Sequence, residues 1–266
     1  KVNIAVVLLR HLSNFTDFNA LERDPRVHLF YTNNTDELEK ADIIILPGSK
    51  STLSDLYELR RNGVAQAVVR AHREGTAVLG ICGGYQLMGQ EVLDPDHVEG
   101  DIDRLPGLGL LPVSTRMTGE KVTRQVNFQL LESCRTAVSH GNSHPPTLNF
   151  QPPTPNFQLK GYEIHMGETV RDASAKPLVR LLRREGEIED GCQTENAFGT
   201  YLHGVFDAPE AALRTAQALA KKKGVTLTDE ALDTHAYKEQ QYDKLADSVR
   251  KSLDMERIYR IMEGKA

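Results

Sequence analysis

The sequence has few cysteines, no excess of basic residues and no long apolar segment. Its 266 residues include only three cysteines, and the formal net charge is −5 at pH 7. The spacing of Cys82, Cys134 and Cys192 fits neither a metal site nor a disulfide framework, so we expect a reducing, cytoplasmic setting. The net charge gives no indication of nucleic-acid binding. No apolar run approaches the roughly 18 residues of a membrane helix, and no signal peptide is recognisable, so we expect no membrane association.

What the sequence does contain is a cysteine between an apolar run and a helical pattern. The run at 77–81 predicts a buried strand, Cys82 follows it, and Gly83 and Gly84 open a short helix. A cysteine in such a sharp connection is the thiol counterpart of the serine nucleophile elbow. The positive end of the helix dipole is expected to lower the thiol pKa and favour the thiolate. The alternative is a small cysteine buried in the core.

The first half of the sequence alternates between strand and helix patterns. Strands are predicted at 2–9, 27–31, 43–46 and 77–81, and helices at 35–40, 51–62 and 64–73. This alternation is typical of a parallel sheet with helices on both faces, and we predict an α/β, flavodoxin-like fold. The carboxyl ends of such strands share one edge, where open α/β sheets place their sites.

The second half is more β-rich. Strand patterns occupy 108–116, 121–131, 160–170 and 178–183. Residues 139–158 contain five prolines and predict an exposed loop. Two histidines in that loop, His140 and His144, lack a carboxylate or thiol to complete a ligand set, so no metal site is expected. Helical patterns at 208–223 and 235–263 end the chain, which we predict to form one domain over 1–266, with these C-terminal helices packed on the main sheet.

A base for the thiol is expected far along the sequence. His203 ends a β-rich segment, is followed by Gly204, and directly precedes the helix predicted at 208–223. Cysteine and histidine that are distant in sequence but adjacent in the fold are the usual arrangement for thiol catalysis. A histidine satisfied within the core is the alternative.

A glycine-containing loop follows the strand at 43–46. Free N–H groups at Gly48 and at Gly83 are predicted to form an oxyanion hole. Ser49, in the same loop, is predicted to contact the substrate. The run from Gly48 to Thr52 superficially resembles a phosphate loop, but the full Gly-x-x-x-x-Gly-Lys-Ser/Thr spacing is absent.

Two further segments carry polar side chains. Glu163 and His165 lie on one face of the strand predicted at 160–170, because side chains alternate along a strand. Residues 13–18 follow the first strand at the same sheet edge. Either segment is predicted to line a substrate pocket, and the alternative for each is a turn with local side-chain hydrogen bonds.

Taken together, these motifs resemble the glutaminase domain of the cobyric acid synthases, the cobalamin-pathway branch of the triad (class I) glutamine amidotransferases. The matching segments are 13–18, 46–52, 80–86, 161–165 and 199–204. The resemblance implies that Cys82 is the nucleophile and His203 the base, and that Gln86 helps to hold glutamine. It also implies glutamine hydrolysis through a thioester on Cys82.

The resemblance further implies a second, N-terminal domain, which we expect to be missing from this chain. In that family an ATP-dependent synthetase domain uses the released ammonia to amidate corrinoid side-chain carboxylates, converting adenosylcobyrinic acid a,c-diamide to adenosylcobyric acid. ATP and magnesium are expected there, and no cofactor in the present domain. The corrinoid substrate would be contacted through the synthetase domain. The chain begins inside a strand pattern without an initiator methionine, and we expect a fragment.

One position departs from the common triad pattern. Most class I amidotransferases have a glutamate two residues after the histidine, and here that residue is Val205. Candidates for the third catalytic member are, in falling order, Glu163, Asp17 and Asp207. A Cys-His dyad and a carboxylate from the missing domain are the other options.

Two other functions compete with the glutaminase interpretation. Flavodoxin-like proteins with a cysteine elbow include peptidases and glyoxalase- or chaperone-type proteins that do not use glutamine. Alternatively, the chain is a docking module with an inactive elbow, and the helix at 235–263 or the proline-rich loop binds a partner.

Overall fold

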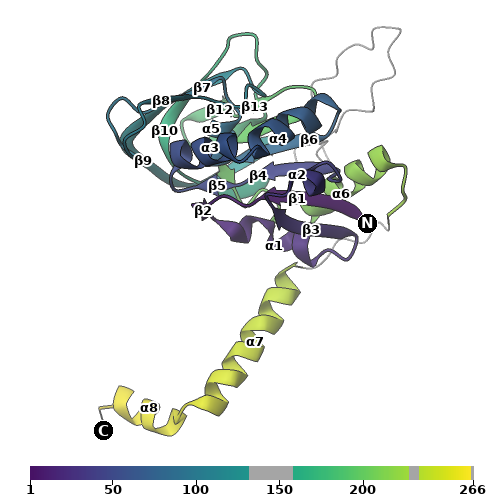
Figure 1. Ribbon diagram of the computed structural model, residues 1–266. Coiled ribbons are helices and arrows are strands. Elements are labelled where there is room, and N and C mark those ends of the chain that lie inside the picture. The colour runs from purple at the N-terminus through teal and green to yellow at the C-terminus, as the bar shows by residue number, and fades with distance from the viewer. Residues whose placement is uncertain (132–157, 228–233, 265–266) are drawn as a thin grey trace. The chain divides into compact units, whose positions relative to one another are not determined.

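The computed structural model describes residues 1–131, 158–227 and 234–264. The chain divides into two compact units, Lys1–Glu230 and Ala231–Ala266. Most of the loop predicted at 139–158, including His140 and His144, lies outside the described residues, as does Cys134. The first unit contains the described β-sheets and every predicted site residue (Figure 1).

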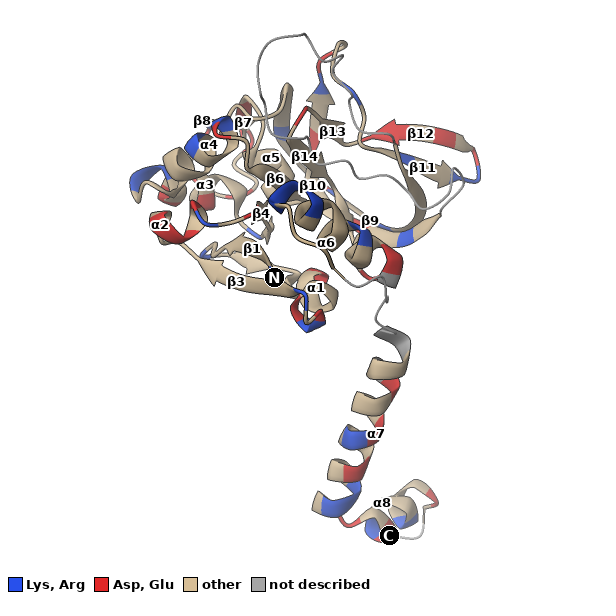
Figure 2. Ribbon diagram, turned by 90° about the vertical axis from the view of Figure 1, so that its right-hand side faces the viewer, with Lys and Arg blue, Asp and Glu red and all other residues tan. Residues whose placement is uncertain are grey.

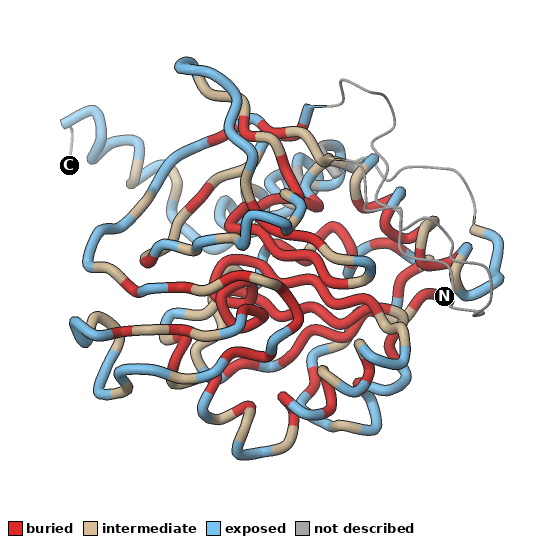
Figure 3. The backbone as a smooth tube through the Cα atoms, turned by 90° about the horizontal axis from the view of Figure 1, so that it is seen from above, coloured by how far each residue is buried: buried red, intermediate tan, exposed pale blue. Residues whose placement is uncertain are grey.

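A six-stranded sheet forms the centre of the first unit. Its order is β13-β14-β6-β4-β1-β3, with β13 antiparallel at one edge and all other pairs parallel. The strands are β1 (Val2–Val7), β3 (Val27–Thr32), β4 (Ile43–Leu46), β6 (Ala77–Ile81), β13 (Cys192–Gln193) and β14 (Ala197–Thr200). The central strands are buried, as Figure 3 shows. The predicted parallel α/β sheet is confirmed.

Helices cover both faces of this sheet, also as predicted. Ala5 and Ile44 pack in one apolar cluster with Leu56 and Val68, whereas the alternate position Ile4 packs in another, with Leu21 and Ala216. The helices on the first side are α2 (Thr35–Leu38), α3 (Thr52–Arg61) and α4 (Val64–Arg73); those on the second are α1 (Asn19–Arg23) and α6 (Pro209–Lys223). Each fully buried aliphatic side chain contributes about 1.5–3 kcal/mol to folding.

The second half builds a largely antiparallel seven-stranded sheet. Its strands are β7 (Glu91–Leu93), β8 (Arg104–Pro106), β9 (Val113–Leu130), β10 (Leu159–Arg171), β11 (Val179–Arg183), β12 (Gly186–Asp190) and β15 (Leu202–His203). The strands predicted at 108–116 and 121–131 are one strand, because β9 continues through Gly119. A bulge between Met166 and Glu168 of the paired β10 shifts the register, and Gly167 there has φ +88°.

Two short elements at the sheet edge have no counterpart in the sequence analysis. β2 (Leu12–Ser13) and β5 (Gly48–Ser49) form a two-stranded antiparallel sheet that joins the segment after β1 to the segment after β4. They are followed by the 3-10 helix η1 (Phe15–Phe18) and by α3, respectively. The elbow helix α5 (Gly83–Leu87) begins beside β5, because a Cβ at Gly83 would lie 2.8 Å from Ser49 N.

The second unit contains two helices, α7 (Thr234–Ser252) and α8 (Met255–Met262). The sequence predicted a single amphipathic pattern at 235–263. The chain breaks at Asp254, whose carboxylate accepts a hydrogen bond from Arg257 N (3.0 Å) and caps α8. Packing of these helices on the main sheet, and hence a single domain, stays a prediction. None of the described helices is long and apolar enough to span a membrane.

Candidate active site

Cys82 occupies the apex of the predicted elbow. Its backbone angles, φ 55° and ψ −113°, fall outside the regions that non-glycine residues commonly adopt. The glycines around it are required sterically. A Cβ at Gly84 would lie 1.9 Å from the carbonyl oxygen of Leu46, and one at Gly80 would lie 2.5 Å from the Met88 sulfur. The elbow therefore holds Cys82 in a strained conformation that only this glycine pattern permits.

The thiol environment differs from the prediction. The Cys82 side chain is buried, and burial raises the pKa of the Cys82 thiol to about 12, with the charges of Asp17 and Glu99 acting in the same direction. A hydrogen bond from the Gly83 N–H lowers the pKa, but it does not offset burial. Sγ donates to the carbonyl oxygen of Ile164 (3.4 Å), which favours the protonated form. The predicted thiolate-favouring environment is not found, because the effect of burial is larger than that of the Gly83 N–H.

His203 and Asp17 form a buried pair. Nδ1 of His203 lies 2.7 Å from Asp17 Oδ2, and Asp17 Oδ1 accepts a hydrogen bond from Gly204 N (3.2 Å). A carboxylate on Nδ1 assigns the ring proton to that nitrogen, which leaves Nε2 as the basic atom. Asp17 lies in η1, directly after β2, and His203 ends β15. The structure thus provides a histidine with a carboxylate in the orienting position.

The predicted order of third-member candidates is wrong. Glu163 is buried, but it contacts Arg124 and lies 3.9 Å from Arg183. Its neighbour on β10, Tyr162, is the residue that pairs with His203, so the alternation of side chains directs Glu163 to the opposite face. The last candidate, Asp207, is exposed and lies against Gly204. Asp17 contacts His203 through a hydrogen bond, which makes it the best-placed third member.

Two flat groups, the Tyr162 ring and the Asn14 amide, lie against the imidazole of His203. The Tyr162 ring is stacked on it, with centroids 5.0 Å apart and an interplanar angle of 18°. The Asn14 amide nitrogen lies 3.0 Å from Nε2 and 3.3 Å from Nδ1. In-plane lone pairs of the two ring nitrogens diverge, so such similar distances place the amide over the ring face. The amide therefore leaves the in-plane lone pair of Nε2 available for a proton.

The glycines predicted for the oxyanion hole lie beside these groups. Ser13 pairs with Gly48 across the β2–β5 sheet, and a Cβ at Gly48 would lie 3.5 Å from His203 Cε1. A Cβ at Gly83 would lie 2.8 Å from Ser49 N. The loop after β4 therefore lies close to both the elbow and the histidine. That the N–H groups of Gly48 and Gly83 bind an oxyanion stays a prediction.

Ser49 is engaged within the protein. Its hydroxyl donates to Asp55 Oδ2 (2.6 Å) and accepts a hydrogen bond from Ser51 N (2.9 Å). Asp55 also contacts His11 Nδ1 (3.0 Å), so this carboxylate organises the loop after β4. The predicted contact of Ser49 with substrate requires one of these hydrogen bonds to be exchanged.

Gln86 and His165 are likewise enclosed. The Gln86 amide donates to Met166 O (2.8 Å) and Tyr201 Oη (3.1 Å), and its oxygen accepts from Thr52 Oγ1 (2.9 Å). The His165 ring stacks on Tyr201 at 3.7 Å between centroids, and burial lowers the pKa of His165. Gln86 connects the elbow helix to β10, whereas His165 packs β10 against Tyr201. Their roles in substrate binding stay predictions.

The sequence analysis did not single out several residues that lie at the site. Asn14 and Tyr162 lie within segments that the sequence analysis had selected, but nothing in the sequence showed that they face His203. Glu99 had no signal at all. Its carboxylate accepts from Leu53 N (3.2 Å) at the start of α3, and burial raises the pKa of Glu99. No group of three or more potential metal-ligating side chains occurs in the described part of the chain.

Comparison with known sequences identifies the family to which this chain belongs. A sequence model described as the CobB/CobQ-like glutamine amidotransferase domain matches residues 3–211. A cobyric acid synthase from Bacteroides fragilis is 60% identical over 266 residues, covering 98% of this chain and 48% of that protein. One from Citrobacter koseri is 42% identical, covering 98% and 49%. The chain therefore spans about half the length of the curated relatives it matches.

Solved structures show the same fold at low sequence identity. The PurLQS structure from Thermotoga maritima aligns with a TM-score of 0.56 at 18% identity, covering 83% of this chain and 98% of that one. A crystal structure of a glutamine amidotransferase aligns with a TM-score of 0.55 at 17% identity, covering 84% of this chain and 99% of that one.

Proposed function

Because the chain belongs to the CobB/CobQ-like glutamine amidotransferase domain family, we propose that it hydrolyses the side-chain amide of glutamine through a thioester on Cys82. The observation that carries this proposal is the hydrogen bond between His203 Nδ1 and Asp17, which aims the basic Nε2 away from the carboxylate. A nucleophile on an elbow, a histidine and an orienting carboxylate are the parts of a thiol-based triad.

The first half-reaction forms the thioester. The Cys82 thiol leaves the carbonyl of Ile164 and gives its proton to Nε2 of His203 as sulfur attacks the glutamine amide carbon. The oxyanion that forms accepts hydrogen bonds from the N–H groups of Gly48 and Gly83. Collapse of the intermediate releases ammonia, which takes the proton from Nε2. Asp17 stabilises the imidazolium throughout.

The second half-reaction uses the same groups. Nε2 removes a proton from water, which attacks the thioester carbon, and the proton returns to sulfur as glutamate leaves. Since burial raises the pKa of the Cys82 thiol to about 12, a preformed thiolate is scarce at neutral pH. Proton transfer to His203 therefore accompanies attack, so the rate depends on the base more strongly than it would for an acidic thiol.

Ammonia released here would serve the other half of the complete enzyme. Relatives that are about twice as long as this chain are cobyric acid synthases. We expect an ATP- and magnesium-dependent synthetase half to amidate corrinoid carboxylates, converting adenosylcobyrinic acid a,c-diamide to adenosylcobyric acid in cobalamin biosynthesis. The corrinoid would reach the enzyme through that half, and no cofactor is required in the described chemistry of Cys82.

The test is glutamate release from glutamine by the chain alone and with the synthetase half of a cobyric acid synthase added. Cys82→Ser and His203→Ala are each expected to lower release at least about 10³-fold, because both remove a member of the triad. Cys192→Ser, the same exchange at a buried cysteine on β13, serves as the control. Release that survives Cys82→Ser, or no release under either condition, would contradict the proposal.

A further inference from the structure

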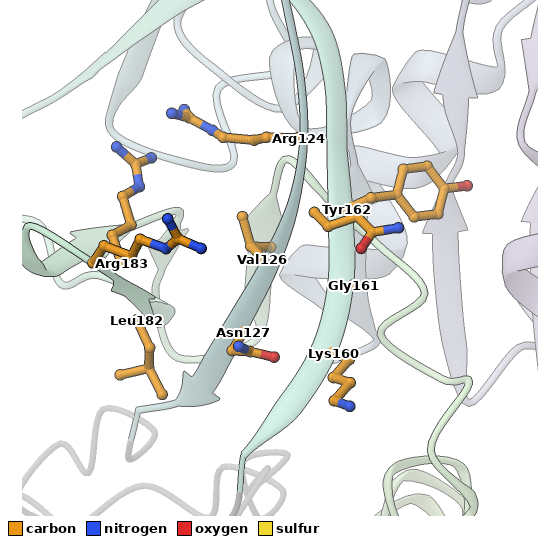
Figure 4. A pocket seen from close by; sticks show the side chains of 10 residues that line it. Arg124, Val126, Asn127, Lys160, Gly161, Tyr162, Leu182 and Arg183 are labelled. Carbon is orange, nitrogen blue, oxygen red and sulfur yellow. The ribbon is translucent and has the colours of Figure 1, made fainter.

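His203 is contacted from two parts of the fold that differ in how they are supported. Strand β10 contributes Tyr162, and Figure 4, a view of the pocket on β9, β10 and β11, shows its ring on the opposite side of β10 from Arg183. Asp17 and the backbone at Gly48 come from the segments after β1 and β4. Strand β10 pairs with β9 over most of its length, whereas β2 and β5 contain two residues each. A pairing that short is only marginally stable by itself, so these two segments need further support.

A buried carboxylate joins the two segments. Asp55 lies near the start of α3 and is 1% exposed. Its Oδ2 accepts a hydrogen bond from the Ser49 hydroxyl (2.6 Å), and its Oδ1 accepts one from the backbone N–H of His11 (3.2 Å). The His11 ring also approaches Oδ1, with Nδ1 at 3.0 Å. One carboxylate therefore contacts β5 and the residue that precedes β2.

Asp55 is itself fixed by the helix that carries it. Leu56 and Leu59 of α3 are buried in the apolar cluster on one face of the parallel sheet. A buried carboxylate is costly unless its oxygens are hydrogen-bonded, and here both oxygens have donors. Because the helix is held by its apolar face, these hydrogen bonds constrain the two segments rather than Asp55.

We propose that Asp55 is a positioning residue for glutamine hydrolysis, which holds the loop after β4 so that the Gly48 N–H stays in place to bind the oxyanion. This role rests on the proposed function, in which Gly48 is an oxyanion donor. A Cβ at Gly48 would lie 2.9 Å from the Ser13 hydroxyl and 3.5 Å from His203 Cε1, so Gly48 is close to both β2 and the base. An oxyanion donor is effective at about 2.7–3.1 Å from the developing charge, and a misplacement of about 1 Å can cost about 10²-fold in rate.

The experiment compares two reactions of Cys82 in the Asp55→Ala variant. Glutamate release should lose about 10²-fold in kcat with KM within about threefold, since a misplaced donor weakens binding of the transition state more than of glutamine. Alkylation of Cys82 by iodoacetamide forms no oxyanion, so its rate at the same pH should stay within about twofold. A general loss of folded protein would instead lower both rates in parallel.

Asp24→Ala is the matched control. Asp24 is 2% exposed, and its Oδ1 accepts hydrogen bonds from Arg26 N (2.9 Å) and Nε (2.8 Å). It follows α1 and precedes β3, at the edge of the parallel sheet opposite to β2 and β5, and Figure 2 shows β1 between α1 and α3. The variant removes an equally buried carboxylate far from the loop, so kcat should stay within about twofold.

Hydrogen exchange of residues 46–52 measures the holding role without turnover. Exchange there should be about tenfold faster or more in Asp55→Ala and unchanged in Asp24→Ala, because local opening exposes amides that native contacts protect. If Asp55→Ala does not fold, Asp55→Asn replaces it with the same expected direction, since an amide offers one acceptor atom in place of two.

Three results would overturn the role of Asp55: unchanged exchange at 46–52, an unchanged kcat, or an equal loss of kcat in Asp24→Ala. No glutamate release from the wild-type chain, alone or with the synthetase half, would contradict the proposed function instead. Exchange at 46–52 would then decide by itself whether Asp55 holds the loop.

Discussion

The two sheets contribute different parts of the reaction site. The parallel sheet delivers Cys82 from the end of β6, and close backbone packing fixes this position. The antiparallel sheet delivers His203 from β15, and hydrogen bonding and stacking hold the ring in place. The nucleophile is therefore positioned by excluded volume, whereas the base is positioned by polar contacts with Asp17 and Tyr162.

This difference follows from burial. Strands β4 and β6 are buried along their whole length, so any added atom meets backbone. Strand β10 contains buried, half-buried and exposed side chains. The partners of its polar side chains therefore depend on which face of the sheet each side chain occupies. Two carboxylates near the site, Asp17 and Glu163, illustrate this, because each is buried but only Asp17 is on the side of the histidine.

The largest expected effect separates these two carboxylates. Asp17→Asn should lower kcat for glutamine hydrolysis by about 10³-fold or more, because an amide does not stabilise the imidazolium and alters the tautomer of His203. Glu163→Gln should leave kcat within about threefold and cost roughly 1 kcal/mol of stability through its weakened contact with Arg124. Steady-state glutamate release measures kcat of each variant, and thermal unfolding measures its stability. A larger loss of kcat in Glu163→Gln than in Asp17→Asn would reverse the assignment.

A second prediction concerns the thiol rather than the base. The rate of Cys82 alkylation by iodoacetamide should rise about tenfold per pH unit from pH 7 to pH 10, because only thiolate reacts and its pKa lies above this range. Burial raises this pKa to about 12, so thiolate keeps increasing with pH through the whole interval. Peptide mapping by mass spectrometry isolates Cys82 from the other cysteines.

Free N-acetylcysteine provides the reference for the alkylation profile. Its rate should level off above pH about 8.5, the ordinary thiol pKa. A plateau for Cys82 at or below that pH would mean that the helix terminus outweighs burial, as the sequence had suggested.

The sequence predicted the parallel sheet closely because its signals are local. The apolar run of β6 and the pattern of α4 depend on residues within a few positions of each other, and both were found at their observed bounds. The elbow at Cys82 is equally local. The residues that belong to it, Gly83 and Gly84, are adjacent in the chain.

The base environment was not predictable in the same way. Asp17 and His203 are 186 residues apart, and their contact depends on the β2–β5 pairing, which is too short to leave a periodic signal. Glu163 was ranked first because it sits in a motif with His165. Which face of β10 meets the histidine depends on its register with β15, and no local pattern encodes that register.

The third prediction tests the steric argument. Gly84→Ala should destabilise the chain by about 3 kcal/mol, because the new Cβ would lie 1.9 Å from Leu46 O and must displace backbone. Gly119→Ala, on β9, places its Cβ in open space and should change stability by less than about 0.5 kcal/mol. Urea unfolding of both variants gives the comparison. Equal losses of stability would show that the backbone around Gly84 adapts to a new Cβ as readily as the backbone around Gly119.

The smallest effect is expected from the stacking that holds the histidine. Tyr162→Leu removes the flat surface beside His203 and should lower kcat about tenfold, since a less fixed imidazole spends less time aligned for proton transfer. Tyr162→Phe keeps the ring and should retain most of the activity. The KM for glutamine should change little in both variants if the role is to position the base. If Tyr162→Phe lost as much activity as Tyr162→Leu, the phenol hydroxyl rather than the stacking would be the important group, and polar contacts alone would position the base.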